Sequence, residues 1–259
     1  MESFKTLKTT EFAFRYKNTQ QLVKLMNTAK ILNTCNACGT TKGFSIRGMT
    51  DDHVMLLELR LDKTIFENFF CKNDVTFGIQ MEILSKLLSK INHDYVDIFL
   101  NDTDVLSLSS QDIYYNIKLL EIHGDTLTES KIDRINCCID LDIDLTLMTN
   151  AIKSVSKLGE TVQFNFISED NEKTFQLHSN CITSSGYVNM RDKEGSGLQF
   201  NKFHEISFVY NMKRIEEIFK NSFSNCVNLR FTEHGVLQCK YEIDSTSYFK
   251  LLLAPQIDD

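Results

Sequence analysis

Apolar residues recur at the spacing of an amphipathic helix in four segments of the chain. In the second segment, Leu84, Leu87, Leu88 and Ile91 follow the i, i+3, i+4, i+7 pattern that forms one apolar stripe. We therefore predict four amphipathic helices, each with one face toward a core. The other three segments lie at residues 22–29, 147–158 and 212–219.

Between the predicted helices, apolar and polar residues alternate with period two. The clearest alternations lie at residues 57–61, 139–145 and 162–166. Residues 227–231 and 237–243 flank Glu233-His234-Gly235, which is typical of a hairpin turn. Strands with one buried and one solvent-exposed face are most typical of antiparallel sheets.

The order of these elements occurs twice along the chain: a strand, a helix, several strands, a helix and several more strands. A chain of 259 residues is long enough for two packed domains. We therefore predict an α+β fold with two similar domains, each with two helices packed on antiparallel sheets. The predicted parts are an N-terminal domain at 1–119 with an extension at 1–10, a connector at 120–135 and a C-terminal domain at 136–259.

The predicted helices also carry lysines, which at about 100° per residue fall away from the apolar stripe. Lysine is a good helix former and belongs on solvated faces, so a single such helix needs no functional explanation. Four such helices in an acidic chain are less easily explained, because Glu82, Glu216 and Glu217 are the main acidic residues on these faces. The lysines concerned are Lys24, Lys30, Lys86, Lys90, Lys153, Lys157, Lys213 and Lys220.

Composition and charge narrow the functional classes. The net charge of −7 and a pI near 5.4 argue against a protein that coats nucleic acid indiscriminately. No apolar run approaches the roughly 20 residues that span a bilayer, so we expect no membrane segment. The first residues lack the apolar core of a signal peptide, and we expect the eight cysteines to be thiols in a reducing compartment.

The sequence offers no convincing catalytic or metal-binding cluster. Cys35 and Cys38 have the spacing of a zinc ligand pair, but no second pair follows. His53 follows two aspartates without a nucleophile or phosphate-loop signature. The alternating aspartates of residues 140–144 imitate a calcium loop, yet leucine and alanine occupy the positions that need glycine and glutamate. We therefore predict neither an enzyme nor a cofactor nor a metal.

The only proline, Pro255, lies in an apolar C-terminal segment. Proline removes an N–H and favours extended geometry before it, so an apolar strand must leave its sheet there. This Leu-Ala-Pro-x-Ile-Asp ending resembles that of the DNA sliding clamps of the proliferating cell nuclear antigen family. Residues 43–54 are similar to the family's Gly-apolar-x-apolar-x-x-Met-Asp-x-x-His-Val segment, with Thr50 in place of the usual aspartate. Further similar segments lie at residues 77–91, 152–160 and 241–243.

This resemblance implies a ring-forming DNA-clamp fold, in which three two-domain subunits place twelve helices around a central hole. The eight lysines would then face double-stranded DNA and attract it without sequence specificity. Such a homotrimer acts as a processivity factor for a DNA polymerase and depends on a clamp loader. The subunit interface that the family implies contains Tyr114, Tyr115, Ile117, Tyr187 and Val188.

The family also implies a groove for partners that carry a Gln-x-x-aliphatic-x-x-aromatic-aromatic motif, namely a DNA polymerase and other replication and repair proteins. Val236 stands where proline is usual and Leu252 where an aromatic residue is usual, which bears on partner preference. Carried over residue by residue, the groove comprises Met49, His53, Val54, Leu56, Leu127, Val236, Leu252, Leu253, Ala254 and Pro255.

An alternative within the same family is a clamp paralogue that forms part of a heterotrimeric ring for damage signalling or transcription. An edge strand that does not complement another copy of this chain would favour that alternative. The resemblance implies a nuclear location, or a cytoplasmic replication site if the source is a virus.

Overall fold

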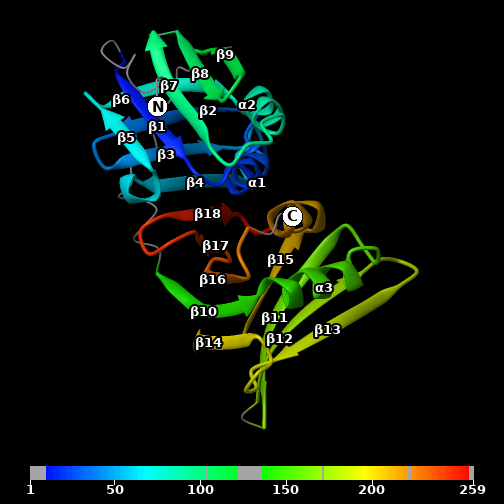
Figure 1. Cartoon of the computed structure of the whole chain (residues 1–259). Helices are drawn as coiled ribbons and strands as arrows, with labels where there is room; N and C mark the ends of the chain where they lie inside the picture. The colour runs from blue at the N-terminus through cyan, green and yellow to red at the C-terminus, as the bar shows by residue number, and fades with distance from the viewer. Residues whose placement is uncertain (1–9, 103, 122–135, 171, 221–222, 257–259) are drawn as a thin grey trace. The chain divides into compact units, whose positions relative to one another are not determined.

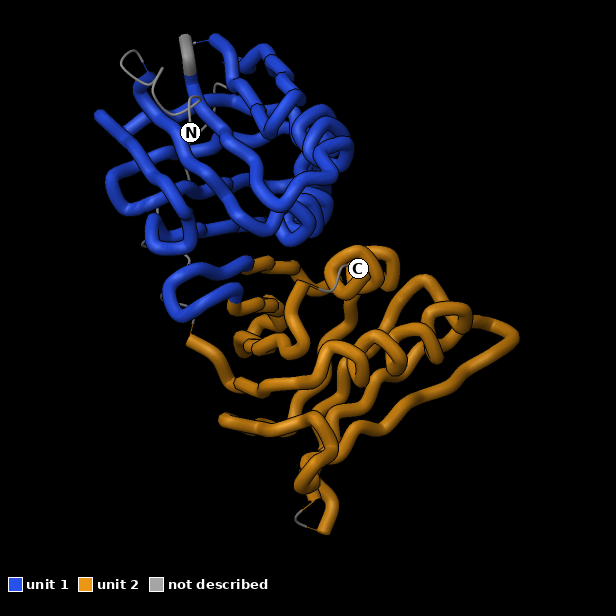
Figure 2. Tube along the Cα trace, in the orientation of Figure 1, with its two compact units in different colours: residues 1–127, 243–249 blue, residues 128–242, 250–259 orange. Residues whose placement is uncertain are grey.

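The computed structural model (Figure 1) describes residues 10–102, 104–121, 136–170, 172–220 and 223–256. It divides into two compact units (Figure 2): unit 1 is residues 1–127 with 243–249, and unit 2 is residues 128–242 with 250–259. Most of the predicted connector, including Leu127, lies outside the described residues. The predicted domain boundaries therefore stay predictions.

Unit 1 contains helices α1 (Thr19–Ala29) and α2 (Met81–Leu88) and a short 3-10 helix, η2 (Lys63–Ile65). One sheet has the strand order β5-β1-β7-β8-β9, and four further strands follow one another in the order β4-β3-β2-β6. Neighbouring strands in both series are antiparallel. The strands are β1 (Phe12–Tyr16), β2 (Thr34–Thr40), β3 (Gly43–Met49), β4 (Met55–Asp62), β5 (Asn68–Cys71), β6 (Val75–Gln80), β7 (Val96–Asp102), β8 (Val105–Ser110) and β9 (Ile113–Lys118).

Unit 2 contains helices α3 (Leu145–Val155) and α4 (Met212–Phe219). Its sheets have the strand orders β13-β12-β11-β15 and β14-β10-β16-β17, and the recorded pairings are again antiparallel. The strands are β10 (Cys137–Asp144), β11 (Thr161–Glu169), β12 (Glu172–Asn180), β13 (Ser185–Arg191), β14 (Leu198–Lys202), β15 (Ile206–Asn211), β16 (Cys226–Thr232), β17 (Leu237–Glu242) and β18 (Tyr248–Leu253), of which β18 has residues in both units.

Each unit has an aromatic core. In unit 1 the rings of Phe12 and Phe14 meet edge to face with centroids 5.6 Å apart, and in unit 2 those of Phe166 and Phe231 do so at 4.9 Å. These residues are fully buried, because alternation along the strands turns every second side chain inward. The predicted α+β fold, with two helices and antiparallel sheets in each half, is confirmed for the described residues.

The helix faces follow the predicted stripes with some departures. Leu84, Leu88 and Ile91 of the second stripe are buried, as expected from their spacing, whereas Leu87 is only half-buried. In α3 the predicted inward residue Leu147 is only half-buried, because the helix begins at Leu145 and Leu145 and Met148 take the inward positions. In the described parts of the chain, no helix is both long and apolar enough to cross a membrane.

Candidate functional site

Unit 1 presents four of the predicted lysines on one helical layer. Lys24 and Lys86 lie within α1 and α2, Lys30 and Lys90 follow the ends of these helices, and all four are exposed. The two helices lie side by side (Figure 1), and the Ser85 hydroxyl donates a hydrogen bond to the Asn27 side chain between them. The apolar stripes turn the ammonium groups away from the core.

Unit 2 presents the other four lysines on α3 and α4, which also pack against each other. Lys153, Lys157, Lys213 and Lys220 are all exposed. A hollow of about 410 Å³ lies between the two helices and includes all of these lysines except Lys157 in its lining. Positively charged groups from two helices therefore surround one depression in this unit.

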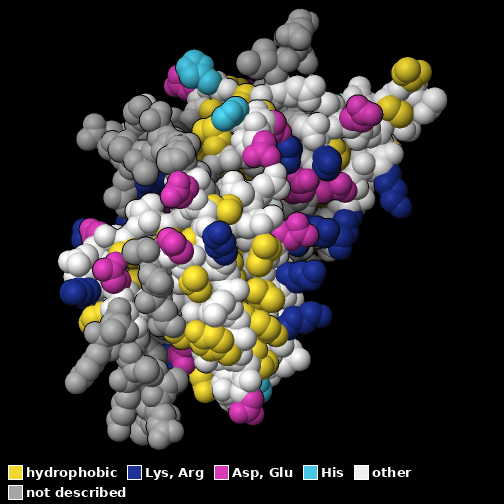
Figure 3. All heavy atoms as spheres, turned by 90° about the horizontal axis from the view of Figure 1, so that it is seen from above, with side chains coloured by type: hydrophobic (Ala, Val, Ile, Leu, Met, Phe, Trp, Pro, Cys, Tyr) yellow, Lys and Arg dark blue, Asp and Glu magenta, His cyan; other side chains and the backbone are white. Residues whose placement is uncertain are grey.

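The eight lysines differ from most other basic residues in having no partner. Within the described ranges their ammonium groups make no ion pair or hydrogen bond. By contrast, Arg15 pairs with Asp97, Arg47 with Glu58, and Arg230 with Asp140. Figure 3 shows Lys and Arg side chains gathered along one edge of the face that it presents. Unpaired ammonium groups on helices can attract phosphate without reading bases, because they reach only the backbone of a duplex.

The first set of predicted groove residues lies at the β3–β4 turn of unit 1. Met49 and Leu56 are opposite each other in the ladder, and the side chains of Met49 and Val54 are exposed. The Met49 sulfur lies 3.3 Å from Nδ1 of His53, whose φ of 58° is left-handed. The turn thus brings Met49, His53 and Val54 together at the surface, whereas Leu56 is buried.

Thr50 holds this turn together and was not assigned a role from the sequence. Its backbone N–H donates to the Met55 carbonyl at 2.8 Å, and its hydroxyl donates to Asp52 Oδ1 at 2.5 Å. The same hydroxyl accepts from the Met55 N–H at 3.1 Å. Thr50 is buried, so its hydroxyl performs the turn-closing role that short polar side chains often have.

The second set of predicted groove residues lies on the tail and on the turn before β17 in unit 2. β18 ends at Leu253, after which the Gln256 N–H donates to the Val209 carbonyl of β15 at 2.8 Å. Gly235 has a φ of 78°, and an added Cβ would lie 3.1 Å from Pro255, so the turn and the tail touch. Ala254 is exposed, whereas Leu252, Pro255 and Val236 are half-buried and Leu253 is buried.

The predicted interface residues lie on sheet edges. β9 is the last strand of its sheet and carries Tyr114 with 52% of its surface exposed, and β13 is the last strand of its own sheet with Tyr187 63% exposed. Tyr115 and Val188 are half-buried, and Ile117 is buried. An edge strand leaves a row of N–H and C=O groups available for another strand.

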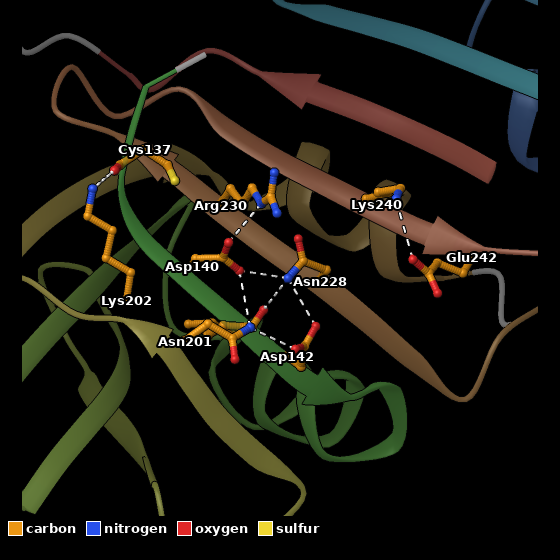
Figure 4. A network of polar contacts seen from close by, with 10 residues as sticks. Cys137, Asp140, Asp142, Asn201, Lys202, Asn228, Arg230, Lys240 and Glu242 are labelled. Atoms are coloured by element: carbon orange, nitrogen blue, oxygen red, sulfur yellow. Dashed lines mark hydrogen bonds and ion pairs between the residues drawn. The ribbon is translucent and has the colours of Figure 1, made fainter. Parts of the chain in front are cut away.

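The alternating aspartates of β10 form a hydrogen-bonded network with neighbouring strands (Figure 4). Arg230 Nε donates to Asp140 at 2.9 Å, and Asn228 Nδ2 donates to Asp140 at 2.8 Å and to Asp142 at 3.0 Å. Asn201 Nδ2 donates to Asp142 at 2.8 Å. These carboxylates are held by the sheet, and no group of three or more metal-ligating side chains is placed to hold an ion within the described parts.

The chain is similar in sequence to known sliding clamps. The family model described as "Proliferating cell nuclear antigen, N-terminal domain" matches residues 11–126. A "Probable DNA polymerase sliding clamp 2" of Paramecium bursaria Chlorella virus 1 is 20% identical over 240 residues, covering 88% of this chain and 84% of that protein. The proliferating cell nuclear antigen of Chaetomium thermophilum is 21% identical over 260 residues, covering 95% and 98%.

Structural similarity extends over the whole fold. The crystal structure of proliferating cellular nuclear antigen from Entamoeba histolytica superposes with a TM-score of 0.83 at 18% sequence identity. The match covers 96% of this chain and 100% of that one.

Proposed function

We propose that the chain is a divergent member of the proliferating cell nuclear antigen family and that it is a DNA sliding clamp that supports a DNA polymerase. The observation that carries this proposal is the set of eight exposed, unpaired lysines on four helices of a chain whose net charge is −7. Both relatives above are aligned with this chain over more than four fifths of its length.

The proposed mechanism is electrostatic and topological, and it involves no catalysed reaction. Exposed ammonium groups attract duplex phosphates without contacting base edges, so the attraction has no preferred sequence. The acidic remainder of the chain disfavours DNA on other surfaces. Retention comes from a closed ring around the duplex, which lets the attraction stay weak enough for sliding.

We propose that the ring is a homotrimer closed through β9 of one subunit and β13 of the next. Each unit has one of these open edges, and each edge carries an exposed tyrosine. Head-to-tail contacts of this kind close into a ring when the rotation allows it. Pairing would also cover two strand edges that are otherwise exposed to aggregation.

For partners, we propose peptides with the motif Gln-x-x-aliphatic-x-x-aromatic-aromatic, bound by the β3–β4 turn and the C-terminal tail. The exposed side chains of Met49, Val54 and Ala254 support apolar contact of this type. Val54→Asp should weaken binding of such a peptide, measured by calorimetry, because it places a charge in an apolar contact. A clamp loader and a nuclear replication site, or a cytoplasmic one for a viral source, belong to the same proposal.

The central test combines Lys86→Glu, Lys153→Glu and Lys220→Glu in one variant. We expect stimulation of polymerase processivity to be lost while the solution mass stays that of the wild type. The matched control combines Lys42→Glu, Lys63→Glu and Lys72→Glu, which alter net charge equally at exposed positions outside α1–α4. Normal stimulation by the helix variant would remove the assignment of these helices to DNA.

A further inference from the structure

The hollow between α3 and α4 contains acidic as well as basic groups. Its floor is apolar, because Ile152 and Phe219 line it and are almost fully buried. Lysines from both helices line it, and so do two neighbouring glutamates of α4, Glu216 and Glu217. Carboxylates at this place oppose the attraction of phosphate, so attraction alone does not explain the composition of the hollow.

The two glutamates differ in their surroundings. Glu217 accepts a hydrogen bond at 2.8 Å from Arg214, one helical turn earlier, so these opposite charges largely cancel. Glu216 is exposed, and in the described part of the chain it has neither an ion pair nor a hydrogen bond. It lies three residues after Lys213 and four before Lys220, which places it beside both on the helix surface.

The corresponding helix of unit 1 has no acid at this position. α2 and α4 both have eight residues and both begin with a methionine directly after a strand. Counted from that methionine, Glu216 corresponds to Ser85, whose hydroxyl bonds to Asn27, and Glu217 corresponds to Lys86. α2 has an exposed glutamate of its own, Glu82, but at the second position of the helix, where α4 has Lys213. A carboxylate at the fifth position is therefore a property of α4 and not of the repeated helix pair.

We propose that Glu216 weakens the attraction between the α3–α4 hollow and duplex phosphates, and so limits how tightly the clamp holds DNA. This inference rests on the proposed sliding-clamp function. A free carboxylate repels phosphate over the same range at which Lys153, Lys213 and Lys220 attract it, because exposed charges interact within about 10 Å at moderate salt. The negative charge of Glu216 in each subunit makes the attraction between the hollow and DNA phosphates weaker. The attraction still does not depend on the base sequence.

The test measures binding of the full chain to a short end-labelled DNA duplex by fluorescence anisotropy over a series of salt concentrations. Glu216→Gln keeps the shape of the side chain and removes its charge. We expect about threefold tighter binding at low salt, since a single exposed charge has a small effect in water. The gain should disappear as salt rises.

Two further variants distinguish failure of the Glu216 proposal from failure of the clamp proposal. Glu194→Gln alters net charge equally at an exposed carboxylate on the β13–β14 turn and should leave binding unchanged. Lys153→Gln should weaken binding by a similar factor if the hollow faces DNA. If Lys153→Gln weakens binding while Glu216→Gln behaves like Glu194→Gln, the role of Glu216 is wrong and the clamp proposal stands. If Lys153→Gln and the charge-reversed helix variant both bind as the wild type does, the helices do not face DNA and both proposals fail.

Discussion

Arg15 and Asp97 form the best-defined buried ion pair of unit 1. The guanidinium donates two hydrogen bonds to the carboxylate, at 2.6 and 2.7 Å, and lies 4.2 Å from the centre of the Tyr95 ring. The hydrogen bond to Asp97 raises the pKa of Arg15 above its ordinary value. Only 17% of the Arg15 side chain is exposed, so removal of the Asp97 carboxylate would leave a guanidinium charge with little water around it and with the Glu67 carboxylate no nearer than 4.0 Å.

We therefore expect Asp97→Ala to lower the free energy of unfolding by about 3 kcal/mol, measured by urea denaturation. Lys17→Ala is the matched comparison, because Lys17 is 71% exposed and pairs with Glu67 at 3.0 Å. An exposed pair contributes less than about 1 kcal/mol. Equal losses in the two variants would contradict the difference in burial.

Cys181 is the thiol whose reactivity the structure sets apart. It is exposed at the β12–β13 turn, and hydrogen bonds from Ser184 first and then Thr183 lower the pKa of Cys181 to about 7. Burial raises the pKa of Cys35 to about 12. Because the thiolate is the reactive form, alkylation of Cys181 should reach half its maximal rate near pH 7, with Cys35 unreactive. Ser184→Ala should move that midpoint upward, as followed by mass spectrometry, and an unmoved midpoint would contradict the role of this hydroxyl.

Helical spacing alone predicted which lysines would be exposed, since a lysine opposite an apolar stripe has only solvent to point into. It did not predict the roles of Thr50 and Glu216. The Thr50 hydroxyl acts through a turn whose closure depends on Met55. Helical spacing would allow Glu216 to pair with Lys213 or Lys220, and only the structure shows that it pairs with neither.

At the scale of elements, α3 and α2 differ in how they begin. Asp144 precedes α3, and its Oδ1 accepts hydrogen bonds from the backbone N–H groups of Thr146 and Leu147, at 2.7 and 3.0 Å. Gln80 occupies the same position before α2 and makes no such bond with its side chain. A side chain that satisfies the first N–H groups of a helix stabilises it.

Asp144→Ala should accordingly lower the free energy of unfolding by about 1 kcal/mol. Gln80→Ala should have almost no effect, because no capping bond is lost. Both are measured by urea denaturation monitored by circular dichroism. A cost at Gln80 as large as at Asp144 would mean that the loss reflects general packing and not the cap.

The helices were easier to predict than the strands. Each helix carries its complete signal in a few turns, as the stripe of α2 shows. Strands such as β8 (Val105–Ser110) and β13 alternate over only a few residues, which is a weak signal in the sequence because their pairing depends on partners elsewhere in the chain. β9 and β13 were located only through family resemblance, and their positions at sheet edges come from the topology.

At the scale of the whole molecule, the edges formed by β9 and β13 determine the predicted assembly. Three copies of the 29.9 kDa chain give about 90 kDa by light scattering if the ring closes on itself. Tyr114→Lys with Tyr187→Lys should reduce the mass toward that of one chain, since charge at an edge opposes strand pairing. Phe70→Lys, on the opposite edge of the β9 sheet, is the control and should leave the mass unchanged.

A wild-type monomer at micromolar concentration would contradict a self-closing ring and would favour the heterotrimeric alternative. A trimer that survives the double tyrosine variant would instead place the subunit contact on other strands.

The two units repeat their helix lengths but not their lysine positions. α1 and α3 each have eleven residues, yet Lys24 is the sixth residue of α1 and Lys153 the ninth of α3. Phosphates along a duplex are evenly spaced. Ammonium groups at uneven intervals cannot all reach their best positions together, so a gain at one contact coincides with a loss at another. The interaction energy between a ring of these subunits and the DNA would therefore vary little with the position of the ring along the duplex. Such a ring would move with low friction in either direction.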